Sequence, residues 1–160
     1  MTKLFFRAAK KSFRFLVDEF QCRVTSEASD AWGDELTYQN STTAVNIRYE
    51  PREKYVFILL CRLVGGKVPE HPGVVHPDTD LNRYGLDDLL KLRAPALKIL
   101  KKEFGVPFTE RNLRTMVETY ARGVRNYAAD ILHGDFSIFP ELEKIVKRRA
   151  EEYRKKSKTQ

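Results

Sequence analysis

The chain has 160 residues, enough for one domain that buries a core without disulfides or a structural metal. Its formal net charge of +7 comes entirely from residues 1–20 and 141–160, because residues 21–140 carry equal numbers of basic and acidic side chains. A basic balance permits binding to a polyanion without establishing it. The N-terminal segment has no continuous apolar stretch of the secretory kind and no run could span a bilayer, so we expect a cytoplasmic protein.

Residues 1–20 are predicted to form an amphipathic helix, since apolar residues, several of them Phe, recur at spacings of three and four from Leu4 to Phe20. We interpret this segment as a core helix with a solvated basic side. The alternative is a helix that lies on a membrane surface or on nucleic acid. The basic residues of this side are Lys3, Arg7, Lys10, Lys11 and Arg14.

Residues 20–64 are predicted to form a four-stranded antiparallel meander, whose first two strands cover 20–25 and 35–40. Alternation of apolar and polar residues from Thr43 to Glu50 predicts a third strand with one buried face. The run Tyr55–Cys61 is apolar on both sides, so we expect a fourth strand that is covered on both faces. The third and fourth strands form the centre of the sheet.

The two cysteines, Cys22 and Cys61, fall at predicted strand positions beside apolar residues. We expect buried, reduced thiols, because a free cysteine behaves as a small hydrophobic residue. A disulfide between them would require adjacent strands and an oxidising compartment.

Residues 65–82 have no periodicity and contain three prolines and three glycines, so we predict a long surface loop. Its spacing of possible ligands matches no recognised zinc pattern, and we therefore expect neither a metal site nor a cofactor. The residues that could contribute to a metal site are His71, His76, Asp78 and Asp80. If the chain were an enzyme, this loop would be the place to look, beginning with His76 and Asp78.

Residues 83–156 are predicted to be helical, with a short helix at 86–93 and its continuation at 95–104. A long helix follows, capped by Thr109 and ended by Gly134, and Pro140 opens the last helix. The apolar pattern of this last helix ends at Tyr153, and we expect residues 157–160 to fray.

Three phrases of the sequence carry a resemblance: Thr43–Arg52, Tyr84–Leu90 and Gly134–Leu142. Together they resemble small bacterial α+β proteins of similar length, which implies a fold and no activity, site or cofactor. The order of helix, meander and helices is also similar to that of some bacterial immunity proteins, which neutralise toxins. This second likeness concerns architecture alone.

The sequence contains no glycine-rich phosphate loop, nucleophile elbow or Cys-x-x-Cys pair, which argues against catalysis. We therefore predict a non-catalytic protein-binding or regulatory module, for example an immunity-like one, with an unidentified protein partner. A chain of charge +7 would repel a basic nuclease toxin. The alternative is a nucleic-acid-binding protein that uses its basic terminal helices, and an unrecognised enzyme ranks third. The candidate binding residues are Lys3, Arg7, Lys10, Lys11, Arg14, Arg148 and Arg149.

Overall fold

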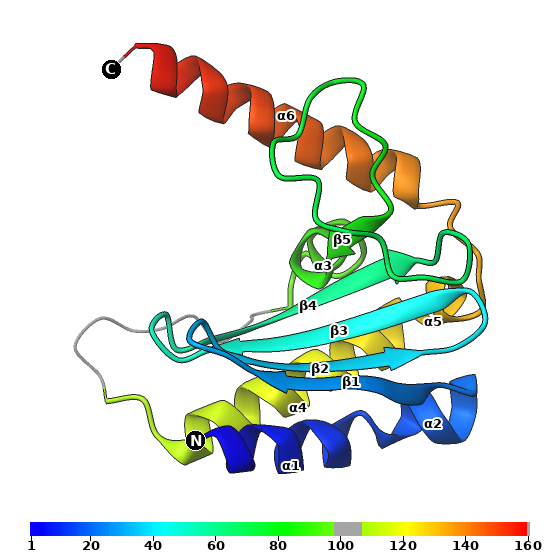
Figure 1. Cartoon of the computed structure of the whole chain (residues 1–160), viewed down its shortest axis with the longest axis vertical. Helices are drawn as coiled ribbons and strands as arrows, with labels where there is room; N and C mark the ends of the chain where they lie inside the picture. Colours follow the sequence, from blue (N-terminus) through cyan, green and yellow to red (C-terminus); the bar gives the residue numbers. More distant parts are fainter. Residues whose placement is uncertain (98–106, 160) are drawn as a thin grey trace.

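The structure, a computed structural model, describes residues 1–97 and 107–159. Its centre is an antiparallel sheet in which every strand pairs with its neighbour in the chain, in the order β1-β2-β3-β4-β5 (Figure 1). The predicted α+β fold with an antiparallel sheet is confirmed, but the sheet has five strands and not four. The strands are β1 (Arg23–Ser29), β2 (Asp34–Gln39), β3 (Thr43–Glu50), β4 (Tyr55–Arg62) and β5 (Arg83–Gly85).

The fifth strand was missed because β5 has three residues, too few to show an alternating pattern. The chain returns after the loop to pair β5 with the free edge of β4. The first strand also differs from its prediction, since Phe20 ends a helix and β1 continues to Ser29. Every residue of β1 is exposed, so this edge strand has no buried face that would have marked its extent.

One face of the sheet is covered by the N-terminal helices and by helices that follow the sheet in the chain (Figure 1). The N-terminal segment forms α1 (Thr2–Ser12) and α2 (Arg14–Phe20), two helices that break at Phe13 where the sequence predicts one. Packed beside α1 is α4 (Glu110–Tyr127), which Thr109 caps as predicted through a capping box with Asn112. The short α5 (Ala129–Leu132) follows it.

Of the two remaining helices, one lies at the edge of the sheet formed by β5, and the other lies on the opposite side of the sheet from α1 (Figure 1). The short α3 (Leu86–Arg93) has the predicted bounds and follows β5 directly. The long α6 (Phe139–Lys158) lies across the sheet from α1 (Figure 1). Of the continuation predicted at 95–104, residues 95–97 are not helical and lie in a turn, so this part of the prediction is wrong, and residues 98–104 lie outside the described part of the chain. Among the described helices, none combines the length and the apolar character that a membrane crossing requires.

The core lies between the covered face of the sheet and α1, α2 and α4, and buried side chains of α3, α5 and the first turns of α6 belong to the same cluster. β3 and β4 contribute to it as opposed apolar pairs, with Val45 facing Leu60 and Ile47 facing Ile58 across the ladder. Aromatic contacts join the layers: the ring centroids of Phe5 on α1 and Tyr49 on β3 lie 5.8 Å apart. The N-terminal helix is therefore a core element, as the interpretation of its Phe-rich side required.

Asn40 ties the turn between β2 and β3 to this helical layer. Its side-chain amide donates to the carbonyl oxygens of Phe20 at 3.2 Å and Leu132 at 2.9 Å. Its side-chain oxygen accepts from the backbone amides of Thr42 and Thr43. One side chain thus satisfies backbone groups of the turn, of α2 and of α5.

Replacing Phe13 with alanine should lower the free energy of unfolding by about 3–5 kcal/mol, since truncating a large buried side chain leaves a cavity. Phe13 is fully buried. Urea denaturation of the parent and the variant measures this loss. Val17→Ala is the matched control. Val17 is 46% exposed, so this substitution should lower the free energy of unfolding by less than about 0.5 kcal/mol. Equal losses for the two variants would mean that the N-terminal helices are not part of the core.

Candidate binding groove

Successive side chains of a strand point to opposite faces of the sheet, so every second residue of β3 and β4 points away from α1 and α4. On β4 this face presents Phe57, Leu59 and Cys61, and on β3 it presents Asn46 and Arg48. The ladder places Asn46 opposite Leu59 and Arg48 opposite Phe57. An apolar row from one strand therefore lies beside a polar row from the next.

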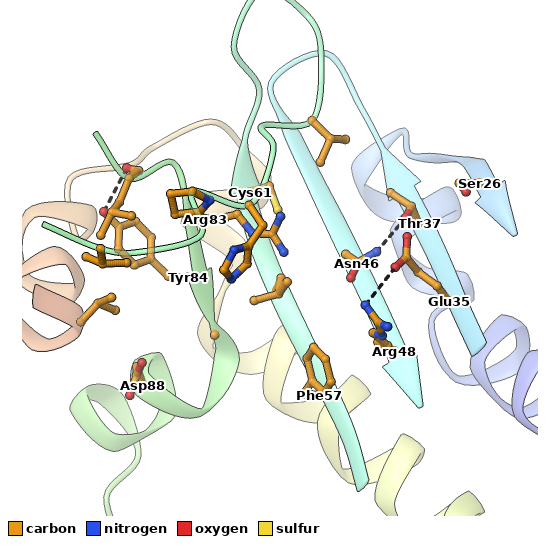
Figure 2. Close-up of a pocket in the computed structure, with 18 of the residues that line it drawn as sticks. Ser26, Glu35, Thr37, Asn46, Arg48, Phe57, Cys61, Arg83, Tyr84 and Asp88 are labelled. Atoms are coloured by element: carbon orange, nitrogen blue, oxygen red, sulfur yellow. Dashed lines mark hydrogen bonds and ion pairs between the residues drawn. The ribbon is translucent and has the colours of Figure 1, made fainter. Parts of the chain in front are cut away.

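These rows form the floor of a groove of about 720 Å³ that residues from all five strands line (Figure 2). The loop 65–82 forms one wall with Val68, His71 and Val75. Val146 and Arg149 of α6 also line the groove. The sequence predicted a cover on both faces of β4, and this groove is where the second face is only partly covered.

The polar part of the floor is held by contacts within the protein. The side-chain amide of Asn46 donates to the Thr37 hydroxyl at 2.9 Å (Figure 2). Arg48 lies 3.9 Å from the Glu35 carboxylate, and both side chains are about one-third exposed. Thr37 and Asn46 are buried, so their bond fixes the shape of the floor before any ligand arrives.

A buried carboxylate closes the end of the groove next to α3. Asp88 is only 5% exposed and accepts from the Arg149 guanidinium at 2.6 Å. Lys91 lies 3.9 Å from the same oxygen. Arg149, which the sequence proposed as a binding residue, therefore joins α6 to α3 through an ion pair. The positive charge of Arg149 offsets the negative charge of Asp88, so the ion pair as a whole does not repel an anion in the groove.

Arg83 on β5 is the cation of the groove that forms no ion pair with any carboxylate of the described chain. It lies opposite Cys61 in the ladder and is half-buried (Figure 2). Its guanidinium donates to the Pro69 carbonyl oxygen at 3.4 Å. A guanidinium has five N–H donors, so most of them remain for a ligand.

Cys61 lies on the groove floor but has the properties of a structural thiol. It is 1% exposed, and burial raises its pKa to about 11, while the positive charge of Arg83 opposes this shift. Burial likewise raises the pKa of Cys22 to about 11. Both cysteines are free and buried, as predicted, and both are protonated at neutral pH.

The loop residues proposed as metal ligands do not converge. His71 lines the groove, and its Nδ1 accepts from the backbone amide of Gly73 at 2.9 Å. His76 instead contacts α6, with its Nδ1 3.1 Å from the Arg154 guanidinium. Asp78 is exposed, and Asp80 accepts from Asn82 at 3.4 Å. Within residues 1–97 and 107–159, no three His, Cys, Asp or Glu side chains gather closely enough to hold a metal ion.

Arg154 holds the loop wall in place. Its guanidinium donates to the Val75 carbonyl oxygen at 2.9 Å, in addition to its contact with His76. The helix α6 continues through Lys158, beyond the point at which the apolar pattern of the sequence ends. A charged side chain, and not an apolar one, therefore anchors this part of the helix, which is why hydrophobic periodicity gave no sign of it.

The two basic segments of the sequence lie on opposite sides of the sheet (Figure 1). On the side of α1, Lys10 pairs with Glu27 at 2.5 Å and Arg14 pairs with Asp18 at 3.3 Å. On the other side, Arg148 is exposed and lines a second hollow along α6. The candidate residues of the two termini therefore do not form one continuous surface.

Sequence reasoning missed the residues that make the groove a site, above all Arg83 and Phe57. Arg83 follows the aperiodic loop, and nothing local to it indicates that it returns to the sheet. Phe57 was interpreted as part of a strand covered on both faces. The alternation of Asn46 and Arg48 with apolar residues was the available signal that one face carries polar groups.

No family model, curated protein or solved structure matches the chain.

The native thiols should react with iodoacetamide at least about tenfold more slowly than the same thiols in urea, because the attacking species is the thiolate. The rate should rise as the pH approaches the pKa of about 11, since burial disfavours the charged form. Mass spectrometry of a labelling time course at several pH values measures both rates. Equal rates for Cys61 in the native and unfolded protein would show that its thiol is accessible and ionised. Cys61 would then be a candidate nucleophile in the groove.

Proposed function

We propose that this chain is a non-catalytic binding module whose groove receives an extended, acidic segment of a partner protein. The observation that carries the proposal is Arg83, a half-buried guanidinium without an ion-pair partner in the described chain, beside the apolar side chains of Phe57 and Leu59. Guanidinium groups bind carboxylates through two parallel hydrogen bonds, which are stronger than bonds between neutral groups.

The dimensions of the groove fit a polypeptide segment. Five strands spaced about 4.8 Å apart give a floor about 19 Å across, which an extended segment of about six residues would span. Phe57 and Leu59 offer apolar contacts where the segment crosses β4, and Val146 offers another from α6. One side chain of the segment thus meets Phe57 and Leu59 on β4, and a carboxylate further along meets Arg83 on the neighbouring β5.

The groove is also prepared for binding. The bond between Thr37 and Asn46 fixes part of the floor, and Arg154 fixes the loop wall. A site that is already ordered loses less conformational entropy when a ligand binds. The protonated thiol of Cys61 and the paired carboxylate of Asp88 favour binding over catalysis, because neither group is poised as a nucleophile or base.

The charge of the chain selects the kind of partner. A net charge of +7 and the unpaired Arg83 favour an acidic segment. This distinguishes the proposal from an immunity-like inhibitor of a basic nuclease, which would carry the opposite charge. The partner is thus defined by chemistry: an extended segment with at least one carboxylate flanked by apolar side chains.

A displayed library of random peptides about twelve residues long, selected on the immobilised protein, tests the proposal, since it covers segments that cross the floor. Enriched peptides should contain Asp or Glu beside apolar residues. Fluorescence polarisation of a synthetic copy should show that Arg83→Ala weakens binding about tenfold or more, because a charged hydrogen-bond pair is lost. Arg7→Ala, the same substitution on the exposed side of α1, should leave the affinity unchanged.

Two results would overturn the proposal. One is a selection that enriches no common peptide. The other is an enriched peptide whose affinity is equal for the parent and for Arg83→Ala. A thermal melt of Arg83→Ala establishes that the variant is folded before its affinity is compared.

A further inference from the structure

The C-terminal half of α6 extends away from the sheet, and the loop 65–82 runs beside the middle of the helix (Figure 1). The helix has 20 residues and a length of about 30 Å, but only Phe139 and Leu142 in its first turns are buried. Beyond residue 146 it contacts the described chain mainly through the ion pair of Arg149 and the bonds of Arg154 to the loop. A helix that projects in this way presents its side chains to a partner.

The projecting part is strongly basic. Residues 144–158 contain eight basic and two acidic side chains. Intrahelical ion pairs occupy Lys147, which lies 2.7 Å from Glu143, and Lys155, which lies 3.1 Å from Glu151. Arg149 pairs with Asp88, and the other five cations form no ion pair with any described carboxylate. Of these five, Arg154 is bonded to the loop, and the remaining four are exposed: Lys144, Arg148, Lys156 and Lys158.

Several of these cations surround a second hollow of about 480 Å³ between α6 and Pro77 of the loop. Helical spacing places Lys144, Lys147, Arg148 and Arg154 along this hollow, with Glu143 and Glu151. Four cations against two carboxylates make it a basic channel. It is distinct from the groove of the sheet, which lies on the other flank of α6 and is lined by Val146 and Arg149.

The nature of the exposed side chains decides between anionic partners. Membrane binding by a surface helix requires an apolar face, and the projecting half of α6 offers only Ala150 and Tyr153. A stable protein interface needs a cluster of buried apolar or aromatic anchors, which the same face lacks. Phosphate groups need neither, because contacts from Lys and Arg supply most of the affinity for a nucleic-acid backbone.

The geometry of α6 agrees with a nucleic-acid backbone. The basic stretch 144–158 extends about 21 Å at 1.5 Å per residue. That length corresponds to about six base pairs at 3.4 Å each. Tyr153 is 73% exposed among these cations, so its ring is free to stack on an unpaired base.

We infer that the projecting half of α6 and the channel beside it bind the phosphate backbone of a nucleic acid. The inference is independent of the peptide groove. It assigns the nucleic-acid alternative to α6 alone, because α1 lies on the opposite side of the sheet (Figure 1).

Fluorescence anisotropy with labelled single strands of about 20 nucleotides and duplexes of about 20 base pairs, at about 50 mM salt, tests the inference, since backbone contacts are strong at low salt. The test variant is Arg148→Glu/Lys156→Glu/Lys158→Glu. The matched control is Lys3→Glu/Arg7→Glu/Lys11→Glu on α1, which changes the net charge equally and also alters only exposed side chains. Circular dichroism verifies that both variants keep the parent's helix content, and Gln replaces Glu at the same positions if one does not.

The α6 variant should bind at least about tenfold more weakly than the parent, and its salt dependence on duplex should fall by about 2.7 in log–log slope, since each lost phosphate contact removes about 0.9. The α1 variant should lose no more than about threefold, and Arg83→Ala should bind nucleic acid like the parent. The inference is wrong if the parent does not bind at low salt, or if both triple variants weaken equally, which would reflect net charge alone. Vesicles containing phosphatidylserine provide the last arm: tighter binding to them than to nucleic acid, lost in the α6 variant, would assign α6 to membranes.

Discussion

The pairing of β3 with β4 sets Ile47 opposite Ile58 and Asn46 opposite Leu59. Because side chains alternate between the two faces of a strand, a shift of one residue in either strand would exchange its faces. Such a shift in β3 would bury Arg48 against the helices and expose Tyr49. The large desolvation cost of burying an unpaired guanidinium makes this alternative register unfavourable. This one register therefore places the core on one side and the groove on the other.

The division of the sheet explains where the remaining elements lie. The two N-terminal helices and α4 supply the apolar cover that the core face requires. The opposite face receives the loop and α6, which cover it in part. The first turns of α6 attach through buried Phe139 and Leu142, and the rest of the helix through polar contacts such as those of Arg149 and Arg154. The loop and α6 therefore form part of both surfaces to which we assign partners, the groove and the basic flank of α6.

The sequence predicted those features that repeat along a single segment. Alternation in β3, the apolar run of β4, the bounds of α3 and the Thr109 cap of α4 all arise from local patterns. The antiparallel fold class followed from them. The extent of β1 was not predictable, because an exposed edge strand has no buried face to impose a pattern.

The groove was less accessible to sequence reasoning because no single segment contains it. It combines β4 with β5, a strand of three residues, with an aperiodic loop and with the flank of a distant helix. Contacts such as Arg149 with Asp88 join residues 61 positions apart and leave no trace in spacing. Composition did indicate the basic terminal segments, but only the structure places them on opposite sides of the sheet.

The central claim is that adjacent residues of β4 serve different purposes: those facing the helices stabilise the fold, and those facing the groove bind a partner. The free energies of unfolding of Ile58→Ala and Phe57→Ala, measured side by side by urea denaturation, test it most directly. Ile58 lies in the core and is 1% exposed, so Ile58→Ala should lower the free energy of unfolding by about 2–5 kcal/mol. Phe57 lies on the groove floor and is only half-buried, so Phe57→Ala should lower the free energy of unfolding by less than half as much. The same substitution should abolish peptide binding. An equal loss of stability for the two variants would contradict the claim, because the groove face would then be a second core.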